Sequence, residues 1–278
     1  MSAPAIDPSV GMARCENCGT ELLGEFCHRC GQSARSPLAS VGAFLRHTLA
    51  GVVDLDSKAV RSARYLLARP GYLTAEFLRG RRASYTAPLQ IYLVAVALFF
   101  LANAYRPFVT FDPETGAIVS SLSASGMTGS LPQSRAADLA RGGVPPEAFR
   151  ERFEGAIAGY MPTFLIGSVL LFALALALFY RRQRRPYVAH TVFALHWTAS
   201  FLLLMILDRL LPERRAGTSP LAVAVFLATL VYLTLALRRV YGQPWATTIA
   251  KGIALFLVFQ VGLALWMLSA VAIASVLV

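Results

Sequence analysis

The sequence has little charge and lacks the marks of a soluble enzyme. Only 15% of its 278 residues are charged, 56% are hydrophobic, and the mean hydropathy is +0.56. Such a composition excludes an ordinary soluble protein. The first fifteen residues lack the continuous apolar core of a secretory signal peptide, so we expect no cleavage. The long apolar runs lack acidic and basic residues near their centres, which weighs against an ion-coupled transporter.

Cysteine is absent after residue 30. The four cysteines form two Cys-x-x-Cys-Gly motifs, Cys15 with Cys18 and Cys27 with Cys30, separated by eight residues. The two-residue gap lets both thiolates of a motif reach one ion, and the glycine permits a tight turn. Residues 1–37 are therefore predicted to be a ribbon with a structural zinc ion, and iron remains an alternative because it accepts the same ligands. Two disulfides or a redox dithiol are the other interpretations.

Residues 38–87 connect the ribbon to the first apolar run. Apolar residues recur at helical spacing over 38–53, and two shorter helices are predicted over Lys58–Ala68 and Tyr72–Arg79. Basic amphipathic helices that lead into a transmembrane segment are typical of a surface with anionic lipid headgroups. The alternative is a small helical bundle packed under the membrane domain.

Residues 88–278 contain five apolar segments that are long enough to cross a hydrocarbon core, which needs about 20 helical residues. We therefore predict an all-α integral membrane protein with five transmembrane helices. The segments are Pro88–Tyr105, Tyr160–Tyr180, Thr191–Leu211, Pro220–Leu237 and Ile249–Leu277.

The positive charge predicts the orientation of the chain. If the N-terminus is cytoplasmic, the inner pieces carry 18 Lys and Arg against 7 acidic residues, which accounts for the whole net charge of +11. The outer pieces carry 8 of each sign. The positive-inside rule therefore puts the N-terminus in the cytoplasm and the C-terminus outside, and no nucleic-acid partner is needed to explain the charge. A reducing cytoplasm also favours a metal over disulfides. The predicted topological anchors are Arg79, Arg81 and Arg82 before the first span, and Arg181, Arg182, Arg184 and Arg185 after the second.

The outer loop, residues 106–159, is the one large piece predicted outside the membrane. Its segment Phe108–Val119 has the pattern of a β-hairpin. The Ser/Gly-rich residues 120–134 are expected to be a mobile connector. A helix is predicted to start at Pro145-Pro146 and to lead toward the second span.

Few polar side chains lie within the predicted spans. His190 and His196 belong to the third span and Gln260 to the fifth. Six residues on a helix turn through about 600°, so the two histidines point about 120° apart and do not chelate one ion by themselves. His196 shares a face with Ser200, which allows a polar seam of His196, Ser200 and Gln260 between the third and fifth spans. The favoured interpretation is interhelical hydrogen bonding that stabilises packing, and the polar seam is the alternative.

Three segments together carry a family resemblance: Cys15–Gln32, the junction Leu67–Phe100 with its Arg69-Pro-Gly motif, and His190–His196. They resemble the bacterial domain-of-unknown-function family numbered 3667. The resemblance implies a multi-pass membrane protein that bears a zinc ribbon, and it supplies no catalytic residue.

Two functions are compatible with these features. The first is a non-enzymatic adaptor or assembly factor of the bacterial inner membrane, in which the cytoplasmic ribbon binds a protein partner. The second is a carrier or lipid-handling protein with a polar path between the third and fifth spans. The sequence contains no catalytic constellation.

Overall fold

Five long apolar helices dominate the computed structural model. It describes residues 14–40, 42, 44, 57–105, 109–111, 117–120, 127–130, 146–209 and 220–277. Each helix is long and apolar enough to cross a membrane. This confirms the prediction of a helical membrane protein with five spans for the described residues. The helices are α4 (Pro88–Tyr105), α6 (Pro146–Phe179), α7 (Tyr187–Arg209), α8 (Pro220–Tyr241) and α9 (Trp245–Leu277).

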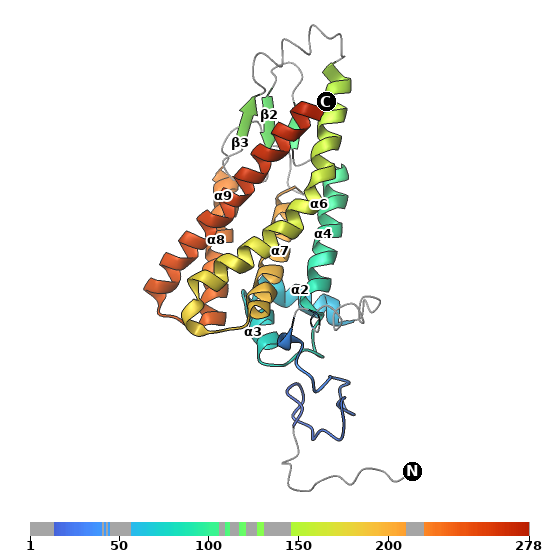
Figure 1. Cartoon of the computed structure of the whole chain (residues 1–278), viewed down its shortest axis with the longest axis vertical. Coiled ribbons are helices and arrows are strands. Elements are labelled where there is room, and N and C mark those ends of the chain that lie inside the picture. The colour runs from blue at the N-terminus through green and yellow to red at the C-terminus, as the bar shows by residue number, and fades with distance from the viewer. Residues whose placement is uncertain are drawn as a thin grey trace.

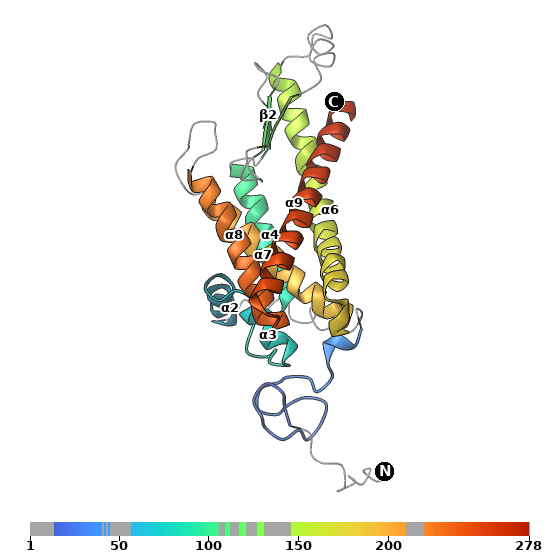
Figure 2. The same ribbon diagram turned by 90° about the vertical axis from the view of Figure 1, so that its left-hand side faces the viewer.

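Helix α7 is the central helix of the bundle. Its span, Tyr187–Ile206, is 72% buried inside the protein, whereas the other four spans are 28–33% buried. Helices α4, α6 and α8 pack around it, and α9 packs on α6 and α8 (Figures 1 and 2). Small residues such as Ala194 and Ala199 are fully buried on α7, so the neighbouring helices approach it closely.

Helix α6 runs from the outer loop into the second span without a break, as the sequence pattern allows. The helix expected to start near Pro146 and the second span form one helix of 34 residues, about 51 Å at 1.5 Å per residue. Pro162 lies inside it. A proline removes one backbone hydrogen bond, and neighbouring helices of a membrane bundle compensate for that loss.

Three short strands lie between α4 and α6. Strands β1 (Val109–Phe111) and β2 (Ala117–Ser120) pair antiparallel, with Thr110 opposite Val119. The predicted hairpin is therefore present, and its turn lies outside the described residues. A third strand, β3 (Met127–Ser130), pairs with β2 inside the segment that was expected to be a mobile connector. That expectation is corrected: pairing with β2 orders Met127–Ser130, although their composition favours a linker.

The segment before α4 forms helices α2 (Ser57–Ala68) and α3 (Tyr72–Leu78), as predicted, and is preceded by the short 3-10 helix η1 (Pro37–Ala39). Most of the amphipathic helix predicted over 38–53 lies outside the described residues. Helix α2 exposes Val60 and Leu67. Helix α3 is instead buried over most of its length and packs on α7 and α8, as the alternative of a packed bundle anticipates.

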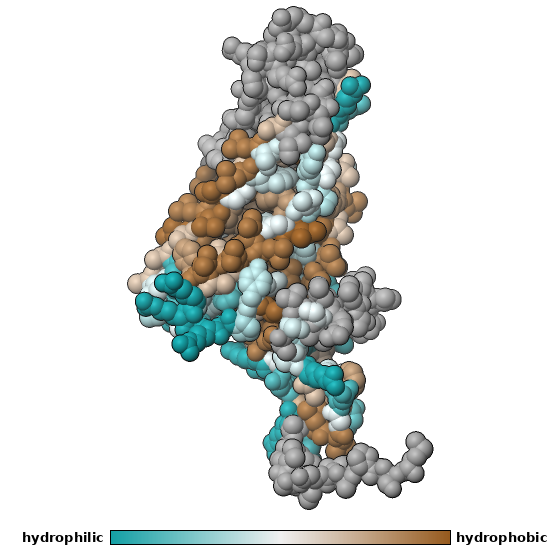
Figure 3. Space-filling view, in the orientation of Figure 1, coloured by the Kyte–Doolittle hydropathy of each residue, from teal (hydrophilic) through white to brown (hydrophobic). Residues whose placement is uncertain are grey.

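The two ends of the molecule differ in polarity. The ribbon, the turn between α6 and α7 and the turn between α8 and α9 lie toward one end, and the strands and the C-terminus lie toward the other (Figures 1 and 2). Hydrophilic side chains gather at the ribbon end, beside a broad hydrophobic band (Figure 3).

Candidate metal centre and its docking to the membrane domain

The ribbon is built from two matching turns. In the first, the Gly19 N–H donates to the Cys15 carbonyl and the Cys15 N–H donates to the Thr20 carbonyl, both at 2.8 Å. The second turn, Cys27–Gln32, repeats these bonds at 2.8 and 2.9 Å. Gly19 and Gly31 have φ values of +75° and +71°, which glycine adopts at little cost. The glycine after each cysteine pair is therefore required by the backbone.

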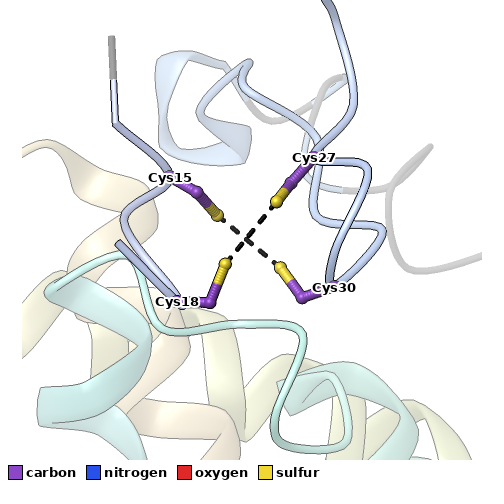
Figure 4. Close-up of side chains that lie close together, drawn as sticks. All are labelled: Cys15, Cys18, Cys27 and Cys30. Carbon is purple, nitrogen blue, oxygen red and sulfur yellow. Dashed lines mark hydrogen bonds between the residues drawn. The ribbon is translucent and has the colours of Figure 1, made fainter. Parts of the chain in front are cut away.

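The four cysteine side chains converge on one point (Figure 4). Their Sγ atoms all lie within 4.8 Å of one another, with 3.6 Å between Cys15 and Cys30 and 3.5 Å between Cys18 and Cys27. A tetrahedral ion with metal–sulfur bonds of 2.3 Å would hold its sulfurs about 3.8 Å apart. A disulfide requires about 2.05 Å, and all four cysteines are free. The donor set and its spacing thus fit a metal ion and no disulfide.

Two of these thiols have different surroundings, which shift their pKa values in opposite directions. Hydrogen bonds from the side chain and backbone of Thr20 lower the pKa of Cys18 to about 6. Burial raises the pKa of Cys30 to about 11. A metal ion deprotonates its thiol ligands, so it would convert both to thiolates. Four protein ligands leave no position for water or substrate, and the site is suited to a structural role.

One side chain of the ribbon fastens it to the membrane domain. Gln32 is 6% exposed and follows the second cysteine motif. Its Nε2 donates to the Gly80 carbonyl at 2.7 Å, and its Oε1 accepts from the N–H groups of Arg82 and Ala83 at 3.1 Å each. This amide therefore satisfies three backbone groups of the loop between α3 and α4.

A second set of contacts joins the first cysteine motif to the same loop. The buried Arg82 forms a salt bridge of 3.3 Å with Glu16, and Ser84 Oγ donates to Asn17 Oδ1 at 3.1 Å. Burial lowers the pKa of the Arg82 guanidinium, and the charge of Glu16 opposes that shift. A side chain at Gly80 would overlap the Glu16 carboxylate. The ribbon thus lies directly on the loop and is fixed at both of its motifs.

The three arginines predicted as the first topological anchor make specific contacts. Arg79 and Arg81 form salt bridges of 2.9 and 3.0 Å with Glu76, whose side chain is 4% exposed. Arg82 pairs with Glu16 as described above. The pairing explains how an acidic side chain is buried in α3. Whether these arginines also set the orientation of the first span stays a prediction.

Helix α3 is held by buried polar contacts with the bundle. Thr74 Oγ1 lies 2.9 Å from His196 Nδ1, in hydrogen-bond contact. Ser200 Oγ donates to the Tyr232 hydroxyl at 2.9 Å, and that hydroxyl donates to the Leu66 carbonyl of α2. Two of the polar residues singled out in the third span thus bind the segment before the first span, directly or through Tyr232.

The two histidines of α7 belong to different sites. His190 Nδ1 lies 2.7 Å from the Tyr241 hydroxyl at the end of α8, whereas His196 faces α3. This agrees with the helical geometry, which predicts that they do not share an ion.

The polar seam predicted between the third and fifth spans is not what the structure contains. Trp197 and Phe201 of α7 pack on the Phe259 ring of α9 with centroid distances of 5.8 and 5.0 Å. The Gln260 side-chain oxygen is buried without a hydrogen-bond partner among the described residues. The contact between α7 and α9 is therefore aromatic, because the polar face of α7 is turned toward α3 and α8.

The second predicted anchor lies on the turn after α6. Arg181, Arg182 and Arg184 are exposed. Arg185 donates from Nη2 to the Val240 carbonyl at 3.0 Å and so ties this turn to the end of α8. Their effect on orientation also stays a prediction.

Sequence reasoning missed the residues that join the ribbon to the bundle. Gln32, Thr74 and Glu76 were not singled out. One signal was available: Glu76 is an acidic residue in a segment whose other residues are typical of a buried helix. It follows three small or apolar residues and precedes several arginines. That pattern indicates a paired acid, although it does not indicate its place under α7.

Comparison with known proteins gives one match. Residues 56–100 match the family model described as "Protein of unknown function (DUF3667)". This match confirms the resemblance at the junction Leu67–Phe100, and it contains α2, α3, the loop that binds the ribbon and most of α4. Cys15–Gln32 and His190–His196 lie outside it. No curated protein and no solved structure matches the chain.

Proposed function

We propose that this chain is a membrane-anchored adaptor whose ribbon, folded around a zinc ion, presents a binding surface to a cytoplasmic protein. The supporting observation is that the ribbon keeps exposed apolar side chains although part of it is docked. Glu16, Asn17 and Gln32 contact the loop before α4. Leu23 and Phe26 leave 76% and 63% of their surface accessible.

Exposed apolar side chains on so small a module favour a protein partner. Leu23 and Phe26 lie between the two cysteine motifs, where the metal ligands hold the chain and limit its freedom. A prearranged apolar pair surrounded by polar residues is the usual centre of a protein interface. Zinc is the proposed ion because four thiolates in a tetrahedral arrangement are its commonest structural site.

Substituting Leu23→Asp is expected to reduce partner binding at least about tenfold, since burial of a leucine contributes about 1.5–3 kcal/mol and a buried charge opposes binding. A photo-crosslinking residue at Gly24, where the structure leaves open space for a side chain, would report the captured partner in intact membranes. Arg29→Ala is the matched control, because Arg29 is exposed on the second cysteine motif. If Leu23→Asp still captures the partner and its metal content is unchanged, the proposal that Leu23 and Phe26 form the binding surface is wrong.

We further propose that the protein lies in the bacterial inner membrane with its N-terminus in the cytoplasm and its C-terminus outside. The supporting observation is that the ribbon and the basic turn Arg181–Arg185 lie toward the same end of the bundle, and α9 ends toward the other (Figures 1 and 2). Anionic lipid headgroups on the cytoplasmic side would attract that basic end.

The orientation is tested by labelling with a maleimide that does not cross membranes. A cysteine added after Val278 is expected to react in intact cells. A cysteine in place of the exposed Arg184 is expected to react only after the membrane is permeabilised. The opposite pattern would show that the N-terminus is outside.

A further inference from the structure

An apolar groove of about 780 Å³ runs along the outer face of α6 and α9. This volume falls in the range of about 300–1,000 Å³ that is usual for ligand sites. At its floor the Phe164 and Trp266 rings stack with their centroids 4.2 Å apart. Six aliphatic side chains of the lining are 45–66% exposed: Leu171, Leu174, Leu178, Val258, Val261 and Leu265.

Two glycines keep the groove open. Gly167 of α6 and Gly262 of α9 both line it, and no heavy atom lies within 4 Å of the position that a Cβ would take at either residue. The helices are therefore not in close contact at these glycines. The space is of the kind that a chain of methylene groups fills.

The end of the groove near Leu178 carries positive charge. Phe179, the next residue, accepts a hydrogen bond of 2.8 Å from Lys251 Nζ, which lies 4.4 Å from the centre of the Tyr180 ring. Arg182 is close enough to interact electrostatically with Lys251. Among the described residues no acidic side chain forms a salt bridge with either group.

Two neighbouring cations without a salt-bridge partner among the described residues favour the binding of an anion. The Lys251 ammonium has three N–H donors, and the Phe179 carbonyl accepts from one of them. The exposed Arg182 offers a planar fork that matches phosphate oxygens. A zwitterionic headgroup would bring a further positive charge to this place, whereas an anionic one would neutralise it.

We propose that the groove between α6 and α9 binds an anionic phospholipid, with an acyl chain along Gly167 and Gly262 and the phosphate against Lys251 and Arg182. The site is independent of the ribbon and of the adaptor function. Its lining includes the Phe259 ring of α9, which also contacts α7, together with the exposed aliphatic side chains of α6 and α9, so the lipid is bound at the rim of the bundle.

The test uses the full chain in vesicles of phosphatidylcholine that contain phosphatidylglycerol, with a photoreactive group on the acyl chain of one lipid or the other. Crosslinks to α6 and α9 are expected to favour phosphatidylglycerol. Lys251→Gln is expected to reduce that preference about fivefold, the contribution of one basic residue at a membrane surface. Arg184→Gln, which removes an equal charge outside the groove, is expected to leave it unchanged. Equal labelling by both lipids in the unmodified protein would overturn the proposal.

A second pair of variants tests the groove itself. Gly262→Leu places a side chain in the groove at a position where no heavy atom lies within 4 Å of the Cβ, and it is expected to reduce crosslinking by both lipids. Gly155→Leu, at an open position of α6 that does not line the groove, is the control. Undiminished crosslinking in Gly262→Leu would overturn the proposal. The proposal would also be overturned if the unmodified protein were a dimer in detergent and Gly262→Leu were a monomer. That result would identify the groove as a contact between two copies of the chain.

Discussion

Replacing Cys15 and Cys27 with serine is expected to abolish metal binding and to unfold residues 14–33. The two buried thiolates supply half of the ligands, and the ribbon has almost no apolar core of its own, because Leu23 and Phe26 are exposed. In comparable small modules the metal contributes about 10–16 kcal/mol to folding. Metal content per purified chain should fall from one ion to none, and limited proteolysis should then cut within residues 14–33.

The matched control for this prediction is His28→Ala. His28 lies within the second cysteine motif and is exposed, so it should not ligate the ion, and the variant should retain one metal ion per chain. A double-serine variant that keeps its full metal content, or that resists protease as the unmodified chain does, would contradict the assignment of the four-cysteine site. Elemental analysis of the unmodified protein would in the same experiment distinguish zinc from iron.

Loss of the ribbon is also expected to expose the loop before α4. Without Gln32, the N–H groups of Arg82 and Ala83 and the Gly80 carbonyl lose their partners. Water can replace these bonds once the ribbon has left, but the loop then loses the contacts with Gln32 and Glu16 that fix its position. A metal ion bound by the four cysteines would thus stabilise this loop as well as the ribbon.

Local sequence patterns predicted the parts of this protein that depend on neighbouring residues. The cysteine spacing predicted the four-thiolate cluster because each Cys-x-x-Cys-Gly turn closes through bonds within six residues. Hydropathy predicted five spans because a helix satisfies its own backbone and needs only length and apolar side chains to cross lipid.

These local patterns did not predict contacts between residues that are distant in the sequence. Thr74 and His196 are 122 residues apart, and Gln32 and Gly80 are 48 apart. No periodicity distinguishes a short basic helix at a lipid surface from one held beneath α7, because both need one apolar face. The seam with Gln260 is therefore not formed, whereas the interpretation of His196 and Ser200 as residues that hydrogen-bond between helices agrees with their bonds to Thr74 and Tyr232.

The ribbon and the bundle are connected by a continuous chain of contacts. Gln32 holds the loop at Gly80, Glu76 binds the arginines at the start of that loop, and Thr74 binds His196. All three contacts involve one stretch of about ten residues, and that stretch lies within the segment matched by the family model. The docking of the ribbon on the bundle therefore depends on how α3 packs against α8.

Substituting Gly71→Ala is expected to displace α3 and to reduce the free energy of unfolding by about 3 kcal/mol. A Cβ at this position would lie 2.7 Å from the Ala236 carbonyl oxygen and 2.8 Å from the Ala236 Cα. These are backbone atoms of α8, which move less readily than the atoms of a side chain. A shift of α3 would also weaken the buried bond between Thr74 and His196, which leaves polar groups unsatisfied at about 1–3 kcal/mol each.

The control is Gly242→Ala, which separates backbone strain from steric overlap. Gly242 has φ +66°, close to the +71° of Gly71, but no heavy atom lies within 4 Å of its Cβ position. It should therefore show only the left-handed strain of about 1–2 kcal/mol. Both variants can be unfolded with denaturing detergent and followed by protease resistance at the loop before α4. If they lose equal stability, the contact between Gly71 and Ala236 does not hold α3. A larger loss in Gly71→Ala, together with cleavage near Gly80, would show that the docking of α3 keeps the ribbon in place.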